Sequence, residues 1–278
     1  MKNKISYILI FTVMLVGLSL LLYPTVSDYW NSLHQSRAIA TYSESVASLD
    51  EAVYDKTLSD AKAFNNSLAN SPIDYTLSDS QKVIYENLLN VDGNGIMGYV
   101  EIPSIRCSLP IYHGTDESIL QIAIGHIEWT SLPVGGENTH CVISGHRGLP
   151  SARLFTDINR LSEGDIFIIR VLNETLTYQV DKIRIVEPQD TEFLEIEEGK
   201  DYCTLMTCTP YGVNSHRLLV RGHRIANQDN SDEIFVTADA TLVEPLIVAP
   251  VLAVPLFIVV TIFSIAKTQF SKDNTSIF

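Results

Sequence analysis

Short β-forming stretches recur between residues 97 and 221, and turn-forming residues separate most of them. Valine, isoleucine, threonine and tyrosine are frequent in the stretches, while glycine, proline, asparagine and aspartate gather between them, as at 133–136. Short strands at this spacing predict an all-β barrel or sandwich. We expect a short helix at 152–159 and strands at residues 97–103, 109–112, 121–125, 139–144, 165–171, 176–186, 201–207 and 217–221.

The last two of these strands flank a loop that contains Pro210, Gly212 and Asn214. Cys208 lies where the first strand ends, and Arg217 lies where the second begins. If the two strands pair antiparallel, the thiol and the guanidinium come close together at one end of the sheet. A neighbouring cation lowers the pKa of a thiol and makes it a better nucleophile. The alternative is that Cys208 is a small buried apolar residue, which is the usual role of a free cysteine.

A histidine elsewhere in the chain favours the nucleophile. The apolar stretch 139–144 breaks into a turn that contains Gly145 and Gly148, which leaves His146 at the end of a strand. A base in that position could meet Cys208, although a single histidine is more often structural than catalytic. A cysteine with a histidine far away in the sequence is nevertheless a known pattern for a catalytic pair.

The remaining cysteines point to a core rather than to a metal. The chain has four cysteines without CxxC spacing, so the sequence predicts neither a disulfide scaffold nor a zinc ribbon. A zinc site built from His140, Cys141, His146 and Cys208 is a weaker alternative. Three cysteines lie in apolar strand contexts and are expected in the core: Cys107, Cys141 and Cys203.

These motifs resemble the sortases, the cysteine transpeptidases of Gram-positive bacteria. The segment 204–217 is similar to the catalytic signature of that family in residue type and spacing, with Arg217 nine residues after Cys208. The segment 144–148, which contains His146, resembles the family as well, and the fuller string 208–224 is similar to the class C branch that assembles pili. The resemblance covers residues 93–225 and implies a mainly β fold, a sortase-type closed β-barrel with short helices.

The resemblance also implies a two-step reaction with a role for each of three residues. Cys208 would attack the carbonyl after threonine in a Leu-Pro-x-Thr-Gly-like (LPxTG-like) sorting signal, so that a thioester forms and the glycine side leaves. His146 would act as general acid and then as general base, and Arg217 would stabilise the oxyanion. In class C enzymes the acceptor is a lysine amine of another pilin, so the implied partners are pilin subunits with sorting signals and acceptor lysines. The implied chemistry requires no metal or organic cofactor.

Two uncharged apolar runs, at residues 5–23 and 245–266, are each long enough to cross a bilayer as a helix. We expect both to be transmembrane helices, and a cleavable signal peptide is the alternative for the first run. Lysines flank the outer side of each run, so we expect both termini in the cytoplasm and the catalytic domain outside the cell. The whole chain carries −14 and the two tails carry +3, so the segment between the runs carries −17. Such an acidic segment is not suited to nucleic acid.

The region 24–92 is predicted to be mostly helical. An imperfect apolar stripe in residues 28–70 favours one or two amphipathic helices. Ser78 with Gln81 forms a capping box for a further short helix. Pro72 lies between these helices and breaks the pattern, because proline disfavours helical geometry at the residue before it.

The break at residues 71–78, here called the lid segment, lies where class C sortases have a lid. Class C sortases resemble one another in a lid whose Asp-Pro-aromatic motif covers the catalytic groove. Asp74 and Tyr75 stand at that place, but no proline lies between them. Asp74 is a candidate partner for Arg217, and Tyr75 is a candidate cover for Cys208. The alternative is an exposed linker.

The expected organisation is a cytoplasmic tail, a transmembrane helix, an extracellular helical and lid region, the catalytic barrel, a linker, a second transmembrane helix and a second tail. Their boundaries are residues 1–4, 5–23, 24–92, 93–226, 227–244, 245–266 and 267–278. Three other functions compete with a pilus-assembling enzyme: a housekeeping sortase that joins proteins to a cell-wall peptide, a papain-like hydrolase, and a catalytically silent scaffold for surface assembly. The hydrolase is disfavoured because the cysteine follows the histidine in the chain.

Overall fold

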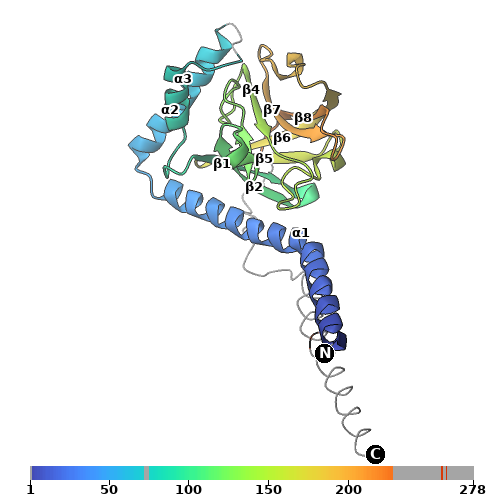
Figure 1. Ribbon diagram of the computed structural model, residues 1–278. Coiled ribbons are helices and arrows are strands. Elements are labelled where there is room, and N and C mark those ends of the chain that lie inside the picture. The colour runs from blue at the N-terminus through green and yellow to red at the C-terminus, as the bar shows by residue number, and fades with distance from the viewer. Residues whose placement is uncertain (1, 72–74, 228–257, 259–260, 262–278) are drawn as a thin grey trace, which may run out of the picture. The chain divides into compact units, whose positions relative to one another are not determined.

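A computed structural model of the chain describes residues 2–71, 75–227, 258 and 261. The chain divides into two compact units, Met1–Val26 with Phe235–Phe278, and Ser27–Ile234. The described part of the second unit is built around a closed barrel with the strand order β1-β2-β3-β4-β7-β8-β6-β5 (Figure 1). The strands are β1 (Ile96–Ile102), β2 (Cys107–His113), β3 (Ile124–His126), β4 (Thr139–Ser144), β5 (Ile166–Val171), β6 (Glu174–Val186), β7 (Asp201–Thr209) and β8 (His216–Arg224).

The predicted barrel is confirmed, and each predicted strand overlaps an observed one. Two expectations about local structure are wrong. The stretch 121–125 is not a strand throughout, because the chain first forms the short helix α4 (Glu117–Leu120) and then returns to place β3 parallel to β2. Residues 152–159 do not form an α-helix. The backbone N–H of Phe155 donates to the carbonyl of His146 at 3.1 Å, and only a 3-10 turn, η2 (Ile158–Arg160), follows.

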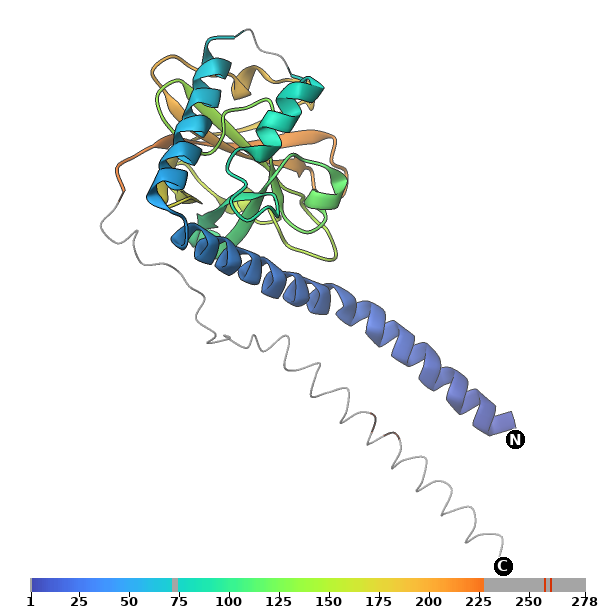
Figure 2. The same cartoon turned by 90° about the vertical axis from the view of Figure 1, so that its left-hand side faces the viewer.

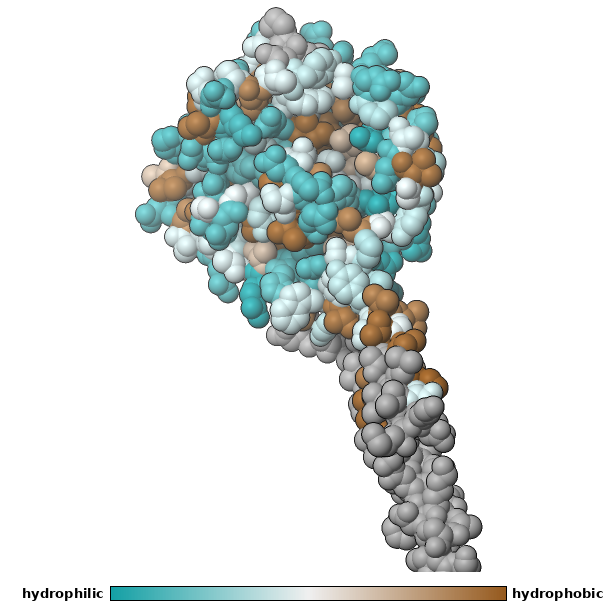
Figure 3. Space-filling model, viewed as in Figure 1, coloured by the Kyte–Doolittle hydropathy of each residue, from teal (hydrophilic) through white to brown (hydrophobic). Residues whose placement is uncertain are grey.

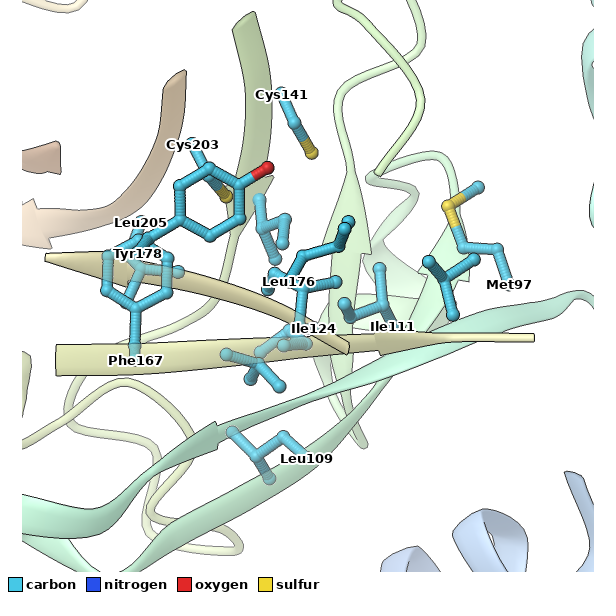
Figure 4. Packing of buried hydrophobic residues seen from close by; sticks show 14 of the residues in the cluster. Met97, Leu109, Ile111, Ile124, Cys141, Phe167, Leu176, Tyr178, Cys203 and Leu205 are labelled. Carbon is cyan, nitrogen blue, oxygen red and sulfur yellow. The ribbon is translucent and has the colours of Figure 1, made fainter. Parts of the chain in front are cut away.

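The interior of the barrel is filled by alternate residues of its strands, as Figure 4 shows for Met97, Ile111 and Leu205. Cys141 and Cys203 are opposite each other in the β4–β7 register, and both are buried in this core. Their predicted core placement is therefore confirmed, and burial raises the pKa of the Cys203 thiol well above its usual value.

The third predicted core cysteine, Cys107, is half-buried at the start of β2. Desolvation of its thiol raises its pKa to about 12. A thiol with so high a pKa is a poor nucleophile at neutral pH, because the thiolate is the reactive form. Cys107 therefore does not compete with Cys208 as a candidate nucleophile.

Three longer helices precede the barrel: α1 (Lys2–Ala47), α2 (Glu51–Ala69) and α3 (Asp79–Asn87). The predicted capping box is present, since the Ser78 side chain accepts from the Gln81 backbone and the Gln81 side chain accepts from the Ser78 backbone. The predicted break between helices is also observed, because α2 ends at Ala69 and α3 begins at Asp79. Figures 1 and 2 show α2 and α3 side by side along one side of the barrel.

The first apolar run lies in α1, which continues through Pro24 into the residues that the sequence assigned to a separate amphipathic helix. Within the described residues, the part of this helix at Val13–Ala47 is long and apolar enough to cross a membrane. Figure 3 shows hydrophobic side chains gathered on it. A signal sequence passes the same test of length and composition. The second predicted run, 245–266, lies outside the described residues except for positions 258 and 261.

Buried hydrogen bonds attach α2 and α3 to the barrel. The side-chain amide of Asn65 in α2 donates to the carbonyl of Leu132 at 3.0 Å and accepts from its N–H at 2.7 Å. The hydroxyl of Tyr85 in α3 lies 2.9 Å from Nδ1 of His126, which is fully buried at the end of β3. Each such bond contributes about 1 kcal/mol net, and leaving a partner unsatisfied costs more. The two helices are therefore firmly docked on the loop between β3 and β4.

Candidate active site

Cys208 and Arg217 are directly opposite each other in the antiparallel pair β7–β8. The strands and the loop between them are those that the sequence predicted. Asn214 in this loop has a positive φ of 58°, and its carbonyl accepts from Nη1 of Arg217 at 3.4 Å. The same nitrogen donates to the carbonyl of His216 at 3.2 Å. Among the residues that the structure describes, no acidic group forms an ion pair with Arg217, so its charge is available to a ligand.

The loop that contains His146 continues β4 alongside β7. Ser144 pairs with Met206 in a parallel register, and the next N–H, of Gly145, donates to the Met206 carbonyl at 3.0 Å. The buried hydroxyl of Thr207 donates to the Gly145 carbonyl at 2.7 Å. His146 and Cys208 each follow the Ser144–Met206 pair by two residues, so both lie at the same end of the barrel. The structure thus places His146 at the same end of the barrel as Cys208 and Arg217.

Gly145 is required at its position because the loop passes close to the core. A Cβ at this residue would lie 2.7 Å from side-chain atoms of Ile124 and Phe155, well inside van der Waals contact. The close approach fixes the path of the backbone immediately before His146. A larger residue at 145 would move the histidine or the strand beneath it.

Cys208 and Arg217 belong to the outer face of the barrel wall. Along β7, Cys203 and Leu205 lie in the barrel core, whereas Met206 packs in a second apolar cluster on the other face. Successive side chains of a strand alternate between faces, so Cys208 shares the face of Met206. In β8 the same rule gives Arg217 the face of Leu219, which belongs to the second cluster. We call this second cluster the outer cluster, and it comprises Ile127, Trp129, Val142, Val186, Phe193, Leu194, Met206 and Leu219.

A groove of about 930 Å³ lies between α2, α3 and the loops that precede β4 and β7. Trp129 and Leu194 of the outer cluster line it, and so do Phe64 and Leu68 of α2. His140 at the start of β4 lines it as well. The groove therefore meets the outer face of β4, toward the end of that strand opposite to His146.

The lid segment is only partly described. Asp74 lies outside the described residues, so its expected pairing with Arg217 stays a prediction. The ring of Tyr75 packs edge-on against Trp129 of the outer cluster, with 5.0 Å between centroids. Its hydroxyl accepts from Thr191 at 3.0 Å. Tyr75 thus connects the helices to the loop before β7, and its expected cover of Cys208 also stays a prediction.

The zinc alternative finds no support in the geometry. Both ring nitrogens of His140 are engaged, Nδ1 with the carbonyl of Glu195 at 2.9 Å and Nε2 with the hydroxyl of Thr204 at 2.7 Å. Burial lowers the pKa of His140 to about 4, so the ring is neutral at physiological pH. Cys141 faces the barrel core, away from Cys208. Within the described ranges, no group of three or more histidine, cysteine and acidic side chains is arranged to hold a metal ion.

Three further residues at this end of the barrel were not predicted from the sequence. Oε2 of Glu117 in α4 lies 3.6 Å from Nε2 of His146. Nη1 of Arg147 donates to the hydroxyl of Thr209, beside Cys208, at 3.2 Å. The ring of Tyr211 covers Gly148 so closely that a Cβ there would lie 2.7 Å from it. No local pattern reveals these contacts, because each joins segments that are far apart in the chain.

Residues 100–225, which contain this site, match the sortase domain family. The chain is 32% identical over 131 residues to Sortase D of Bacillus subtilis, which covers 46% of this chain and 63% of that protein. It is 32% identical over 124 residues to Sortase A of Staphylococcus aureus, and this match covers 43% of this chain and 58% of that protein. The matches thus span about three fifths of these curated relatives.

Solved structures extend the match. Sortase C1 from Streptococcus agalactiae is 51% identical with a TM-score of 0.68, and the match covers 69% of this chain and 100% of that one. Sortase C from Streptococcus pneumoniae is 47% identical with a TM-score of 0.63, and the match covers 69% of this chain and 97% of that one. Sortase C from Clostridium perfringens is 42% identical with a TM-score of 0.61, and the match covers 69% of this chain and 99% of that one. The chain therefore belongs to the sortase family, and sortases of the C type are among its structural neighbours.

Proposed function

We propose that this chain is a membrane-anchored cysteine transpeptidase. It cleaves an LPxTG-like sorting signal between threonine and glycine and transfers the acyl group to a lysine amine of a pilin, which polymerises pili. The observation that carries the proposal is the pairing of Cys208 with Arg217 at the end of the barrel where His146 follows β4. The relatives support the substrate class. The pneumococcal structure is described in terms of pilin substrate specificity, and the clostridial one contains a C-terminal cell wall sorting motif.

In the first step the sulfur of Cys208 bonds to the carbonyl carbon of the threonine. The developing oxyanion faces the Arg217 guanidinium, whose stabilising effect in such sites is typically about 3 kcal/mol. The bond from that carbon to the glycine nitrogen then breaks, and His146 gives the leaving amine its proton. The products are a thioester on Cys208 and a released peptide that begins with glycine.

In the second step a lysine amine of another pilin attacks the thioester carbonyl. His146, now neutral, takes the proton that the amine loses, and the Cys208 sulfur leaves. The product is an isopeptide bond between two subunits. Removal of either Cys208 or His146 is expected to stop the cycle, because each takes part in both steps.

The outer face of β4 and β7 is the proposed seat of the sorting signal. A five-residue extended peptide is about 17 Å long, and the nine residues of β7 exceed that length. The outer cluster offers apolar contact to the leucine and proline of the signal through Met206, which is its half-buried member on β7. The lid segment, through Tyr75 on Trp129, borders the same face. We propose that it limits access of the signal to that face, with Asp74 near Arg217.

The proposed location is the cell membrane, with the barrel outside the cell and both termini in the cytoplasm. One apolar helix is a candidate for the first span. The second span rests on the uncharged run 245–266 and the lysines that follow it. A barrel that is held at the membrane would meet pilins as they emerge with their sorting signals.

Two other functions remain as alternatives within this proposal. A housekeeping sortase would use the same first step but transfer the acyl group to a cell-wall peptide amine. A silent scaffold would form no thioester. The similarity to C-type sortases favours the pilin polymerase over both.

The test is a polymerisation assay with the full chain in detergent micelles and a purified pilin that carries an LPxTG-like signal. A denaturing gel and mass spectrometry of the product would show a ladder joined through lysine. Cys208→Ala should give no ladder, whereas the matched variant Cys107→Ala, which removes a thiol whose pKa is raised to about 12, should retain it. Transfer to glycine amines without a ladder would support the housekeeping enzyme, and a ladder with Cys208→Ala would contradict the proposal.

A further inference from the structure

The imidazole of His146 has one nitrogen that is shielded from water. Nε2 of His146 is buried, and no group in the described part of the chain forms a hydrogen bond with it. The group that faces it is the carboxylate of Glu117, with Oε2 at 3.6 Å. This distance is about 0.5 Å longer than a hydrogen bond, so a small side-chain adjustment would close it.

The Glu117 carboxylate is itself oriented. The side-chain amide of Gln121, one turn further along, donates to its other oxygen, Oε1. This hydrogen bond and the nearby imidazole hold the pKa of the Glu117 carboxyl below its ordinary value, so the group is an anion at neutral pH. One oxygen is thus held by Gln121, and the other is directed at His146.

A carboxylate without a proton can only accept a hydrogen bond. The imidazole nitrogen that faces it must therefore carry the ring proton in the neutral form, which assigns that proton to Nε2. The other nitrogen, Nδ1, then has the free lone pair. Catalytic bases are commonly oriented in this way by a third group.

We propose that Glu117 is a positioning residue that holds His146 in the Nε2–H tautomer and stabilises its imidazolium form. This inference rests on the proposed function and names the atom that moves the proton. In the first step Nδ1–H of the imidazolium donates its proton to the leaving amine, and in the second step the Nδ1 lone pair takes one from the incoming amine. Nε2 keeps its proton, shared with Glu117, in both steps.

The other charged or titratable groups at this end of the barrel include Arg147 on the same loop, the Arg153–Asp157 ion pair on the segment that follows it, Cys208 on β7, and His216 and Arg217 on β8. Arg147 and Arg217 are cations and disfavour a positive imidazole. Within the described residues, Glu117 forms the one ion pair recorded for His146. Because the Glu117 side chain is 72% exposed, water and salt weaken its charge effect, so orientation should contribute more than charge.

Three substitutions separate these effects in the full chain in detergent micelles. Glu117→Gln retains an oxygen that can accept from Nε2–H but removes the charge, and Glu117→Ala removes both. Asp116→Asn is the matched control, since Asp116 is the exposed neighbour at the helix start, without a side-chain hydrogen bond to the helix. Thioester formation and aminolysis are measured separately across pH with a sorting-signal peptide and a lysine-containing acceptor.

We expect Glu117→Ala to slow both half-reactions about 10-fold, a part of the 10²–10⁴-fold that general acid–base catalysis contributes. Glu117→Gln should lose only about 3-fold, because its amide oxygen can still accept from Nε2–H and orient the ring although the charge is gone. Asp116→Asn should match the wild type. A rise only in the KM for the acceptor amine would instead mean that Glu117 binds the acceptor, and it would overturn the positioning role.

A second readout does not depend on activity. Nitrogen-15 NMR of histidine-labelled chain distinguishes the two tautomers of His146, with the signal assigned by loss in His146→Gln. We expect the Nε2–H tautomer in the wild type and a mixed population in Glu117→Ala. An unchanged tautomer and unchanged kinetics in Glu117→Ala would overturn the inference. The proposed function would still stand in that case, provided that the thioester forms on Cys208. Absence of a thioester in the wild type would refute the proposed function, and the NMR result would still decide whether Glu117 orients His146.

Discussion

Replacing Tyr85 by phenylalanine tests how the helices before the barrel are attached to it. The Tyr85 hydroxyl accepts from the N–H of Gly114 at 2.9 Å and lies 2.9 Å from Nδ1 of His126. Nε2 of His126 lies 2.8 Å from the carbonyl of Ser131, which can only accept, so Nε2 carries the proton. Nδ1 is therefore an acceptor, and it lies closer to the Tyr85 hydroxyl than the carbonyl of His126 does, at 2.9 Å against 3.3 Å. We infer that the hydroxyl donates chiefly to Nδ1 while it accepts from Gly114.

Phenylalanine keeps the ring and its packing but removes every hydrogen bond of the hydroxyl. Nδ1 of His126 would be left without a donor in a site that is 0% exposed, at a cost of about 1–3 kcal/mol. The N–H of Gly114 is half-buried and can recover part of its loss from water. The free energy of unfolding should therefore fall by about 3 kcal/mol in all, which corresponds to roughly 6–12 °C in Tm for a unit of this size.

The assay is urea unfolding of the full chain in detergent micelles, followed by tryptophan fluorescence. Trp30→Phe is introduced in every variant, so that the signal reports on Trp129 beside the barrel. Tyr112→Phe is the matched control, because Tyr112 is half-buried and no hydrogen bond of its hydroxyl is present among the described residues. It should change stability by less than about 0.5 kcal/mol. The reasoning is refuted if Tyr85→Phe also stays within about 0.5 kcal/mol of the wild type.

Three further predictions concern the site and its surroundings. Because burial lowers the pKa of His140 to about 4, the unfolded chain binds its proton first as the pH falls, so about 3 kcal/mol of stability present above pH 6.5 should be lost between pH 6.5 and 4. Urea titrations across that range measure the loss, and a His140→Gln chain with the same pH dependence would contradict it. Thr207→Val removes the buried bond to the Gly145 carbonyl and should cost about 1–3 kcal/mol in unfolding experiments and slow thioester formation, whereas an unchanged rate would mean that this bond does not hold the loop of His146. Tyr75→Ala removes the contact with Trp129 and should speed peptide cleavage a few-fold if the lid segment limits access, and an unchanged rate would identify that segment as a linker.

The arrangement of Cys208 and Arg217 could be predicted from the sequence because it is local. Two β-forming stretches around a loop with proline, glycine and asparagine pair with each other, and the loop sets their register. The core placement of Cys203 was predictable as well, since an odd offset of five from Cys208 along a strand turns its side chain to the opposite face. The capping box at Ser78 was predictable for the same reason, because its two hydrogen bonds lie within four residues.

Contacts between distant segments could not be predicted. Asn65 and Leu132 are 67 residues apart, and nothing in either segment indicates that one buries its amide against the other. Glu117 was missed because α4 has only four residues and an apolar stretch follows it, which reads as a strand. The helix expected at 152–159 failed because a backbone N–H there pairs with the His146 carbonyl instead of with its own turn.

The most direct test of the central claim is to trap the acyl-enzyme on the full chain and locate it. The chain is mixed with an LPxTG-like peptide, quenched in acid, digested, and examined by mass spectrometry. The account predicts an acyl group that ends in threonine, in thioester linkage to the peptide containing Cys208, together with release of the glycine fragment. The adduct should be absent from Cys208→Ala. An adduct on another cysteine, or cleavage that persists in Cys208→Ala, would contradict the assignment of Cys208 as the nucleophile.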